Sequence, residues 1–294
     1  MSELELPAPG APVPMGLWIN TNVHSLNAQR HLAASTRAVG RVFGQLASGR
    51  RIAVAADDPA GLAIANRMTA AVRSLAVARD NVLDGANMID VAEGTLGELS
   101  DVLGRTRELL LQSANGALSP ADRAMIDTEI KALTDEAIRM VEVVDFNGIN
   151  LFGVRGDPQI ITVTLQVGRD QGDTLEVQMP EAMRIAVGLK NLDARTEQGA
   201  RAGLAQVDAS IDLISRGRGS LGATRNRLEV AARNLATERE NTSASRSRIM
   251  DVDFAVATAE RTRVQILQNA STTVLSQANV LPSLALTLLD GSVS

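Results

Sequence analysis

The chain has 294 residues, of which 45% are apolar but only 2% aromatic, and its formal net charge at pH 7 is −5. Large aromatic rings anchor thick globular cores, so this composition favours thin layers of Ala, Leu, Val and Ile. Acids and bases are interspersed over the chain as a whole and no basic stripe exists, which argues against nucleic acid and anionic membrane as partners. No apolar run approaches the ~20 residues of a membrane span, which argues against membrane insertion. The absence of cysteine excludes disulfides and thiolate metal sites.

The first helix is expected in residues 18–56, after a Pro-rich extension at 1–17 that does not have the pattern of a secretory signal peptide. Leu32, Val39 and Leu46 are spaced by seven, which is typical of a coiled-coil helix. Gly49 is suited to end this helix. Asp58 and Pro59 have the residue types of a helix cap and a first helical position.

The next segment, 57–145, contains the strongest regularity, a heptad repeat that predicts a helix of about 65 Å. Its apolar seam holds Met68, Leu75, Val82, Ile89, Leu96, Leu103 and Leu110. A companion seam is rich in small residues: Ile64, Ala71, Ala78, Gly85, Ala92 and Leu99. A further helix is expected to start at "SPAD", with Ser119 as its cap and Pro120 as its first residue.

Residues 146–203 change period. Asn147-Gly148 is a strong turn pair, and the alternation in 161–179 predicts a β-hairpin with one buried face. From Gly188 to Gly203 we expect only a short polar connection. Heptads return in 204–245 and 246–294. The predicted fold is therefore mainly α, with long coiled-coil helices from both termini forming an elongated rod and a small β-hairpin region.

Few residues suggest chemistry. "GRGSLG" at 217–222 has dinucleotide-binding spacing, but it lies within a helical seam where that fingerprint does not function. His24 and His31 are seven residues apart, too far for one metal. Asp251 and Asp253 lack the glycine and glutamate of a calcium loop. No constellation of carboxylates, Lys or Ser stands out, so we predict neither an enzyme nor a cofactor.

Several stretches are similar to bacterial flagellins. "INTNVHSLNAQRHL" at 19–32, "LASGRRIAVAADDPAGLAIANRM" at 46–68, "RELLLQSANGALSPADRAMIDTEI" at 107–130 and "DFNGINLF" at 145–152 resemble their N-terminal half. "LGATRNRLEVAARNL" at 221–235, "SASRSRIMDVDFAVATAE" at 243–260 and "QILQNASTTVLSQANVLPSLALTLL" at 265–289 resemble their C-terminal half. The chain departs from the family in its N-terminal extension, in the final "DGSVS" and in lacking the variable outer domains that many flagellins insert.

The resemblance implies a subunit that self-assembles into the extracellular flagellar filament for motility, is exported without a cleavable signal peptide, and folds its terminal helices on polymerisation. Terminal helices would form an inner tube, surrounded by rod helices. Implied partners are the chain itself, hook-associated and cap proteins, an export chaperone and a vertebrate innate flagellin receptor. The resemblance implies an inner-tube seam of Leu26, Leu32, Val39, Leu46, Leu267, Val274, Leu281 and Leu288. A receptor epitope would comprise Arg105, Leu109 and Glu129.

In this interpretation the stretch at 46–68 is a spoke that joins tube to rod, and "SRSRIMDVD" is its counterpart on the return path. We hypothesise that arginines and acids of the two spokes pair within or between subunits: Arg50, Arg51, Asp57, Asp58, Arg246, Arg248, Asp251 and Asp253. Two alternatives stay open. One is a hook–filament junction protein of the same superfamily, and the other is a cytoplasmic coiled-coil scaffold that closes as a small oligomer.

Overall fold

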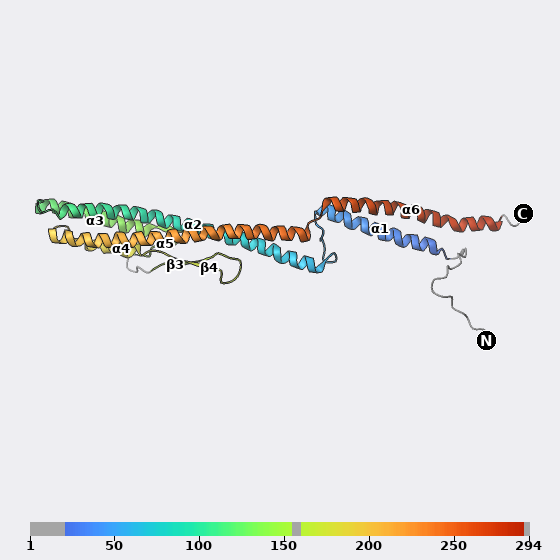
Figure 1. Ribbon diagram of the computed structural model, residues 1–294, viewed down its shortest axis with the longest axis horizontal. Helices are drawn as coiled ribbons and strands as arrows, with labels where there is room; N and C mark the ends of the chain where they lie inside the picture. Colours follow the sequence, from blue (N-terminus) through green and yellow to red (C-terminus); the bar gives the residue numbers. More distant parts are fainter. Residues whose placement is uncertain (1–20, 155–159, 291–294) are drawn as a thin grey trace, which may run out of the picture. The chain divides into compact units, whose positions relative to one another are not determined.

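The computed structural model describes residues 21–154 and 160–290, with the backbone alone at 281 and 284–290 (Figure 1). The extension at 1–17 lies outside this range. The elements in chain order are α1 (Val23–Ser48), α2 (Pro59–Ser113), α3 (Pro120–Val143), β1 (Asp145–Phe146), β2 (Ile149–Asn150), β3 (Thr162–Gln166), β4 (Thr174–Gln178), α4 (Ala182–Gly188), the 3₁₀ turn η1 (Leu189–Asn191), α5 (Glu197–Met250) and α6 (Phe254–Asp290).

Contacts divide the chain into two compact units. The two ends of the chain, 1–66 and 246–294, form one, which we name the terminal unit. Residues 67–245 form the other, the central unit. The mainly α fold expected from the heptads is confirmed.

In the terminal unit, α1 and α6 pack side by side (Figure 1). Both helices are capped by a polar side chain: the Asn22 side chain accepts a hydrogen bond from Ser25 N, and the Asp253 carboxylate accepts from Ala255 N at 2.9 Å. Asn22 Nδ2 also donates to the Ala278 carbonyl at 2.7 Å, which ties the two helices together. The contact is therefore fixed in register by polar groups as well as by apolar side chains.

The core of the central unit lies between α2, α3 and α5. Six of the seven residues in the predicted α2 seam are fully buried, Met68 being half-buried. All five heptad positions of α5 are buried as well: Val207, Ile214, Leu221, Leu228 and Leu235. Along the companion seam the small residues from Ala78 onward are buried, whereas Ile64 is 41% exposed. Small side chains there let the helices approach closely, as the heptad pattern predicted.

The predicted turn and the predicted hairpin are both present. Asn147 (φ 51°) and Gly148 (φ 78°) make the turn between β1 and β2 with the positive φ angles of a type I′ turn. β3 and β4 pair antiparallel, with Val163 opposite Val177. Leu165 packs so closely over Gly85 of α2 that a Cβ at that glycine would clash with it. A glycine in α2 thus creates the space in which the hairpin docks.

The expectation of a short polar connection from Gly188 to Gly203 is wrong. The segment begins in α4 and η1, and α5 starts at Glu197, seven residues before the predicted rod helix. Leu189, Leu192 and Ala194 are at most 5% exposed. Their apolar side chains cover the end of the α2–α5 pair, so the connection belongs to the core. Among the described residues, no helix combines the length and hydrophobicity needed to cross a membrane.

Candidate assembly surfaces

The loop after α1 and the end of α5 form a small backbone joint inside the terminal unit. Gly49, in a left-handed conformation (φ 68°), ends α1, as expected from the sequence. The chain then pairs with the segment after α5: Arg51 N donates to the Met250 carbonyl at 2.7 Å, and Val252 N donates to the Gly49 carbonyl at 3.0 Å. Two segments about 200 residues apart in sequence are therefore joined by main-chain hydrogen bonds.

The charged side chains of this joint bind backbone groups within the chain. The Arg51 guanidinium donates to the Ile249 carbonyl at 2.6 Å, at the C-terminus of α5 where helix carbonyls lack partners. Asp57 accepts from the amides of Ala53 and Val54, each at 3.1 Å. The sequence hypothesis paired these arginines and acids with one another; within one chain Arg51 and Asp57 instead stabilise the ends and turns of the backbone.

The remaining spoke residues take related positions. Asp58 caps α2 by accepting from Gly61 N at 2.9 Å, with Pro59 as the first helical residue, which confirms the predicted helix start. Arg50 and Asp251 face each other in an isolated antiparallel bridge of the backbone. Arg246 and Arg248 lie in the last turns of α5. Ion pairing of these residues between subunits stays a prediction.

Much of the apolar surface of α1 and α6 has no partner in the single chain. Within the predicted inner-tube seam, Leu26 is 52%, Leu267 46% and Val274 56% exposed. Leu32, Val39 and Leu46 are half-buried against α6, while the side chains of Leu281 and Leu288 lie outside the described set. α6 instead faces α1 with Ala257, Val264 and Ala278, a second ladder spaced by seven or fourteen that our sequence analysis missed. Small alanines allow this close contact and leave the bulkier ladder open.

Large apolar side chains of both helices have no partner in the single chain, and we name them together the terminal apolar surface. Its members are Val23, Leu26, Phe43, Phe254, Val256, Ile266, Leu267, Val274 and Val280, each between 46% and 66% exposed. Exposed apolar side chains in this number on two packed helices are candidates for contact with other chains. Leu267 and Val274 also line a groove between α6 and α1, whose other side carries His24 and His31.

Asp127 of α3 is a buried carboxylate that binds the connection between η1 and α5. Its side chain is 3% exposed and accepts from Lys131 Nζ at 2.5 Å, Arg195 Nε at 3.1 Å and Ala194 N at 3.2 Å. Burial alone would raise the pKa of Asp127, but these hydrogen bonds and the charge of Lys131 outweigh it and leave the pKa below its ordinary value. Ser113 Oγ donates to the Ala194 carbonyl, so both the backbone amide and the carbonyl of Ala194 are hydrogen-bonded. The sequence signal for this buried acid was its position beside Ile126 and Ile130, which belong to the apolar stripe of α3.

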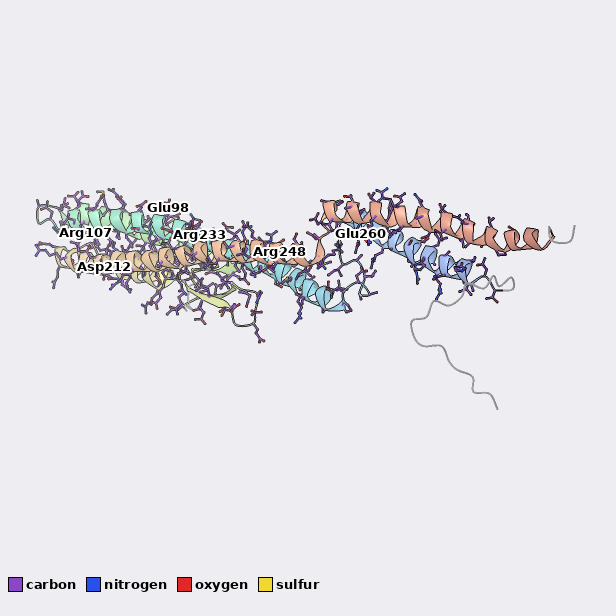
Figure 2. All side chains as sticks on the ribbon, turned by 45° about the vertical axis from the view of Figure 1, so that its right-hand side comes forward. Glu98, Arg107, Asp212, Arg233, Arg248 and Glu260 are labelled. Atoms are coloured by element: carbon purple, nitrogen blue, oxygen red, sulfur yellow. The ribbon has the colours of Figure 1, made fainter. Side chains whose placement is uncertain are left out.

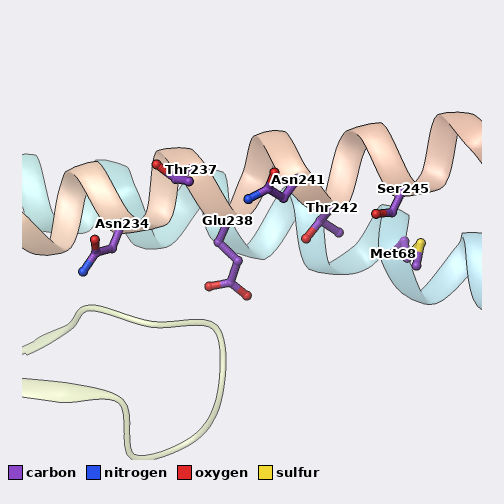
Figure 3. Close-up of a pocket in the computed structure, with 7 residues that line it drawn as sticks. All are labelled: Met68, Asn234, Thr237, Glu238, Asn241, Thr242 and Ser245. Atoms are coloured by element: carbon purple, nitrogen blue, oxygen red, sulfur yellow. The ribbon is translucent and has the colours of Figure 1, made fainter.

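The groove between α2 and α5 shown in Figure 3 is lined by amide and hydroxyl side chains of α5 together with Met68. Its one charged lining residue, Glu238, pairs with Arg169 of the β3–β4 turn at 3.3 Å. These seven lining residues include no base positioned to activate a nucleophile. Among the described residues, no group of His, Asp or Glu is arranged to hold a metal ion. The exposed apolar side chains of α1 and α6 are the candidate surfaces for contact.

Comparisons with known proteins agree with this picture. Residues 19–154 match the bacterial flagellin N-terminal helical region, and residues 204–289 match the bacterial flagellin C-terminal helical region. A flagellin of Halalkalibacterium halodurans is 37% identical over 273 residues, covering 92% of this chain and 99% of that protein. This chain belongs to the bacterial flagellin family. The family is one of structural proteins.

Two further comparisons bear on the choice between a filament subunit and a junction protein. A flagellar filament core protein of Brachyspira hyodysenteriae is 34% identical and covers 92% of the chain and 99% of its own length. A putative flagellar hook-associated protein from Vibrio parahaemolyticus has a similar structure, with a TM-score of 0.58 over 66% of this flagellin and all of that chain. At 17% identity, that likeness shows the fold alone. The sequence relatives therefore favour the filament interpretation over the junction protein.

The three residues of the expected receptor epitope lie together in this flagellin but differ in exposure. Arg105 Nη2 pairs with Glu129 at 2.8 Å, joining α2 to α3, and Arg105 Nη1 contacts Glu108 at 3.3 Å. The hydrogen bonds that the Arg105 guanidinium donates to Glu129 and Glu108 raise the pKa of Arg105 above its ordinary value. Leu109 is only 2% exposed and packs in the core. Arg105 and Glu129 are accessible to a partner, whereas the Leu109 side chain is not.

Proposed function

We propose that this flagellin is the repeating subunit of a flagellar filament and that copies assemble by burying the terminal apolar surface. Family membership and the filament core relative support the role. The observation that carries the mechanism is the exposure of Leu267 and Val274 beside the α1–α6 contact. A contact in which the apolar ladder of one copy covers a different patch on the next is not self-complementary, so it repeats and builds an open helical polymer.

The same surface makes folding depend on assembly. Only Ala28 and Val42 of α1 among the apolar residues are fully buried, and α6 contributes Ala257, Val264 and Ala278. Small side chains bury little area, and long helices without adequate tertiary packing are marginal in water. We therefore propose that α1 and α6 fray in the free subunit and become stably helical when neighbouring copies cover them, which couples folding to binding.

Polymerisation of variants tests the burial. Replacing Leu267 and Val274 by Ser removes two side chains whose burial stabilises the polymer by about 1–1.5 kcal/mol each, since both are half-exposed beforehand. The critical concentration for seeded polymerisation, measured by sedimentation and electron microscopy, should rise about 30- to 140-fold. Val143→Ser, which changes a 65%-exposed valine of α3, is the matched control. Equal polymerisation of the double variant and wild type would refute the burial mechanism.

Hydrogen exchange tests the coupling. In the free subunit, amides of α1 and α6 should exchange far faster than those of the core of α2, and protease should trim both ends. In the filament the same amides should be protected. Strong protection of α1 and α6 in the free subunit would contradict coupled folding. A closed oligomer of fixed size would support the scaffold alternative, and failure of the wild type to elongate alone would support the junction protein.

The remaining proposals rest on the family. We propose that the subunit leaves the cell without a cleavable signal peptide, is accompanied by an export chaperone, and adds between hook-associated proteins and a cap. We also propose that a vertebrate innate receptor contacts the α2–α3 face through Arg105 and Glu129, which are exposed and joined by an ion pair. Titration of purified subunit with the receptor ectodomain tests this contact. Arg105→Ala should weaken binding, whereas an unchanged affinity would refute it.

A further inference from the structure

The charges of α2 and α5 are sorted into blocks. Residues 80–101 of α2 contain six acids and no base, whereas residues 213–230 of α5 contain four arginines and one acid. The two helices run antiparallel, and ion pairs fix their relative level: Arg225 Nε lies 2.6 Å from Asp90, and Arg218 Nη2 lies 3.6 Å from Glu93. The acidic block of α2 and the basic block of α5 therefore lie at the same height along the central unit.

Only part of each block is used inside the chain. Glu98 and Asp101 on α2, and Arg216 and Arg227 on α5, are exposed and form no ion pair among the described residues; Figure 2 labels Glu98 on α2. Heptad spacing puts Glu98 and Asp101 on one outer edge of α2. We name this edge the acidic ridge, and its residues are Asp84, Val91, Gly94, Glu98 and Asp101. Arg216 and Arg227 share an outer edge of α5. We name this edge the basic ridge, and its residues are Leu213, Arg216, Ala223, Arg227 and Val230.

The acidic ridge is also hollowed. A shallow notch on α2 is lined by Gly94 and Gly97 together with Asp90, Glu93, Glu98, Asp101 and Arg218. A Cβ added at Gly94 or Gly97 would meet no atom within 4 Å, so no packing inside the chain requires either glycine. Two such glycines cost helix stability relative to alanine. They leave the α2 backbone open beside Glu98 and Asp101, whereas Asp90 and Glu93 on the inner side of the notch already pair with Arg225 and Arg218.

From these observations we infer that the basic ridge of one copy docks on the acidic ridge of the next copy, side by side and nearly level. The inference rests on the proposed filament role and names the partner of this surface, a second copy of the chain. An arginine of the basic ridge enters the glycine notch, and Val91 of one copy meets Leu213 or Val230 of the other; these three are 41–47% exposed. Because the two ridges differ, the contact is heterologous and repeats around a tube.

Charge reversal gives a decisive test. The α5 variant (Arg216→Glu with Arg227→Glu) and the α2 variant (Glu98→Lys with Asp101→Lys) each bring like charges together in a homopolymer. Each alone should raise the critical concentration at least tenfold in 50 mM NaCl, and less in 1 M NaCl because salt screens the charges. An equimolar mixture of the two variants should polymerise like wild type, since every contact in an alternating filament is complementary again. Failure of the mixture to recover would overturn the inference.

Two controls separate this contact from folding and from the filament role. Arg139→Glu with Arg184→Glu makes the same charge change in α3 and α4, where both arginines pair locally, and should leave polymerisation within twofold of wild type. Gly97→Leu should raise the melting temperature of the free subunit, because leucine favours helix, yet fill the notch and raise the critical concentration at least tenfold. Normal assembly of the α5 variant and of Gly97→Leu would refute this docking while leaving the filament role intact; failure of wild type to polymerise would refute the role itself.

Discussion

Replacing Asp127 by Asn should destabilise the central unit more than any other single polar change, because this carboxylate is the most deeply buried charge of the described residues. The substitution keeps the size of the side chain and retains one acceptor for Ala194 N. It removes the negative charge that faces Lys131 and Arg195, and it turns a second acceptor into a donor that points at two cations. The connection from η1 to α5 then loses the ion pair of Arg195 and keeps only the hydrogen bond of Ala194 N on α3.

The magnitude follows from the exposure of the partners. Hydrogen bonds to charged groups contribute about 1.5–3 kcal/mol each, but Lys131 and Arg195 side chains are 51% and 65% exposed and regain water when the carboxylate is lost. Screening by solvent reduces each contribution toward about 1 kcal/mol. We expect Asp127→Asn to lower the free energy of unfolding by about 2–3 kcal/mol at pH 7.

Urea unfolding of the wild type and the variant as a function of pH measures this loss. The pKa of Asp127 is lowered in the folded chain, so its stabilisation is fully present above the unfolded value of about 3.9 and disappears as pH falls through the folded pKa. The stability difference between wild type and Asp127→Asn should therefore be constant from pH 7 to 5 and shrink below pH 4. Below pH 4 the free energy of unfolding should fall more steeply with decreasing pH in the wild type than in Asp127→Asn.

Two outcomes would refute the reasoning. One is an unfolding free energy unchanged at pH 7, which would mean that the ion pairs contribute nothing net. The other is a difference that persists undiminished at acid pH, which would point to packing instead of charge. Asp135→Asn is the control: Asp135 pairs with Lys190 at 3.4 Å but its side chain is 74% exposed, so its loss should cost under about 0.5 kcal/mol.

Three further changes probe the joints of the fold. Gly85→Val should cost about 1–3 kcal/mol in urea unfolding because its branched side chain displaces Leu165, and adding Leu165→Ala should recover part of the loss; additive losses would argue against a steric cause. Asp58→Ala removes the cap of α2 and should lower stability by about 1 kcal/mol, with Asp58→Asn close to wild type. Arg51→Met should loosen the end of α5, seen as faster hydrogen exchange at Val252 than in Arg50→Met; unchanged exchange would exclude this role.

Local features of the fold were predictable because each depends on residues close in sequence. Three local features each depend on fewer than six residues, and the structure has all of them: the cap of α3 at Ser119 and Pro120, the end of α1 at Gly49, and the Asn147-Gly148 turn. The α2 and α5 seams were equally plain, because an uninterrupted heptad leaves one face of a helix to bury.

The choice of partner was decided only by the tertiary structure. α6 carries two heptad ladders, and hydrophobicity alone favoured the one with Leu267 and Val274; the close approach of α1 selected the alanine ladder with Ala257 and Ala278. Arg51 likewise bonds a carbonyl 198 residues away instead of an acid. Periodicity in a sequence determines that a face must be covered, but which face meets which partner depends on side-chain size and geometry across long separations, and these exist only once the chain has folded.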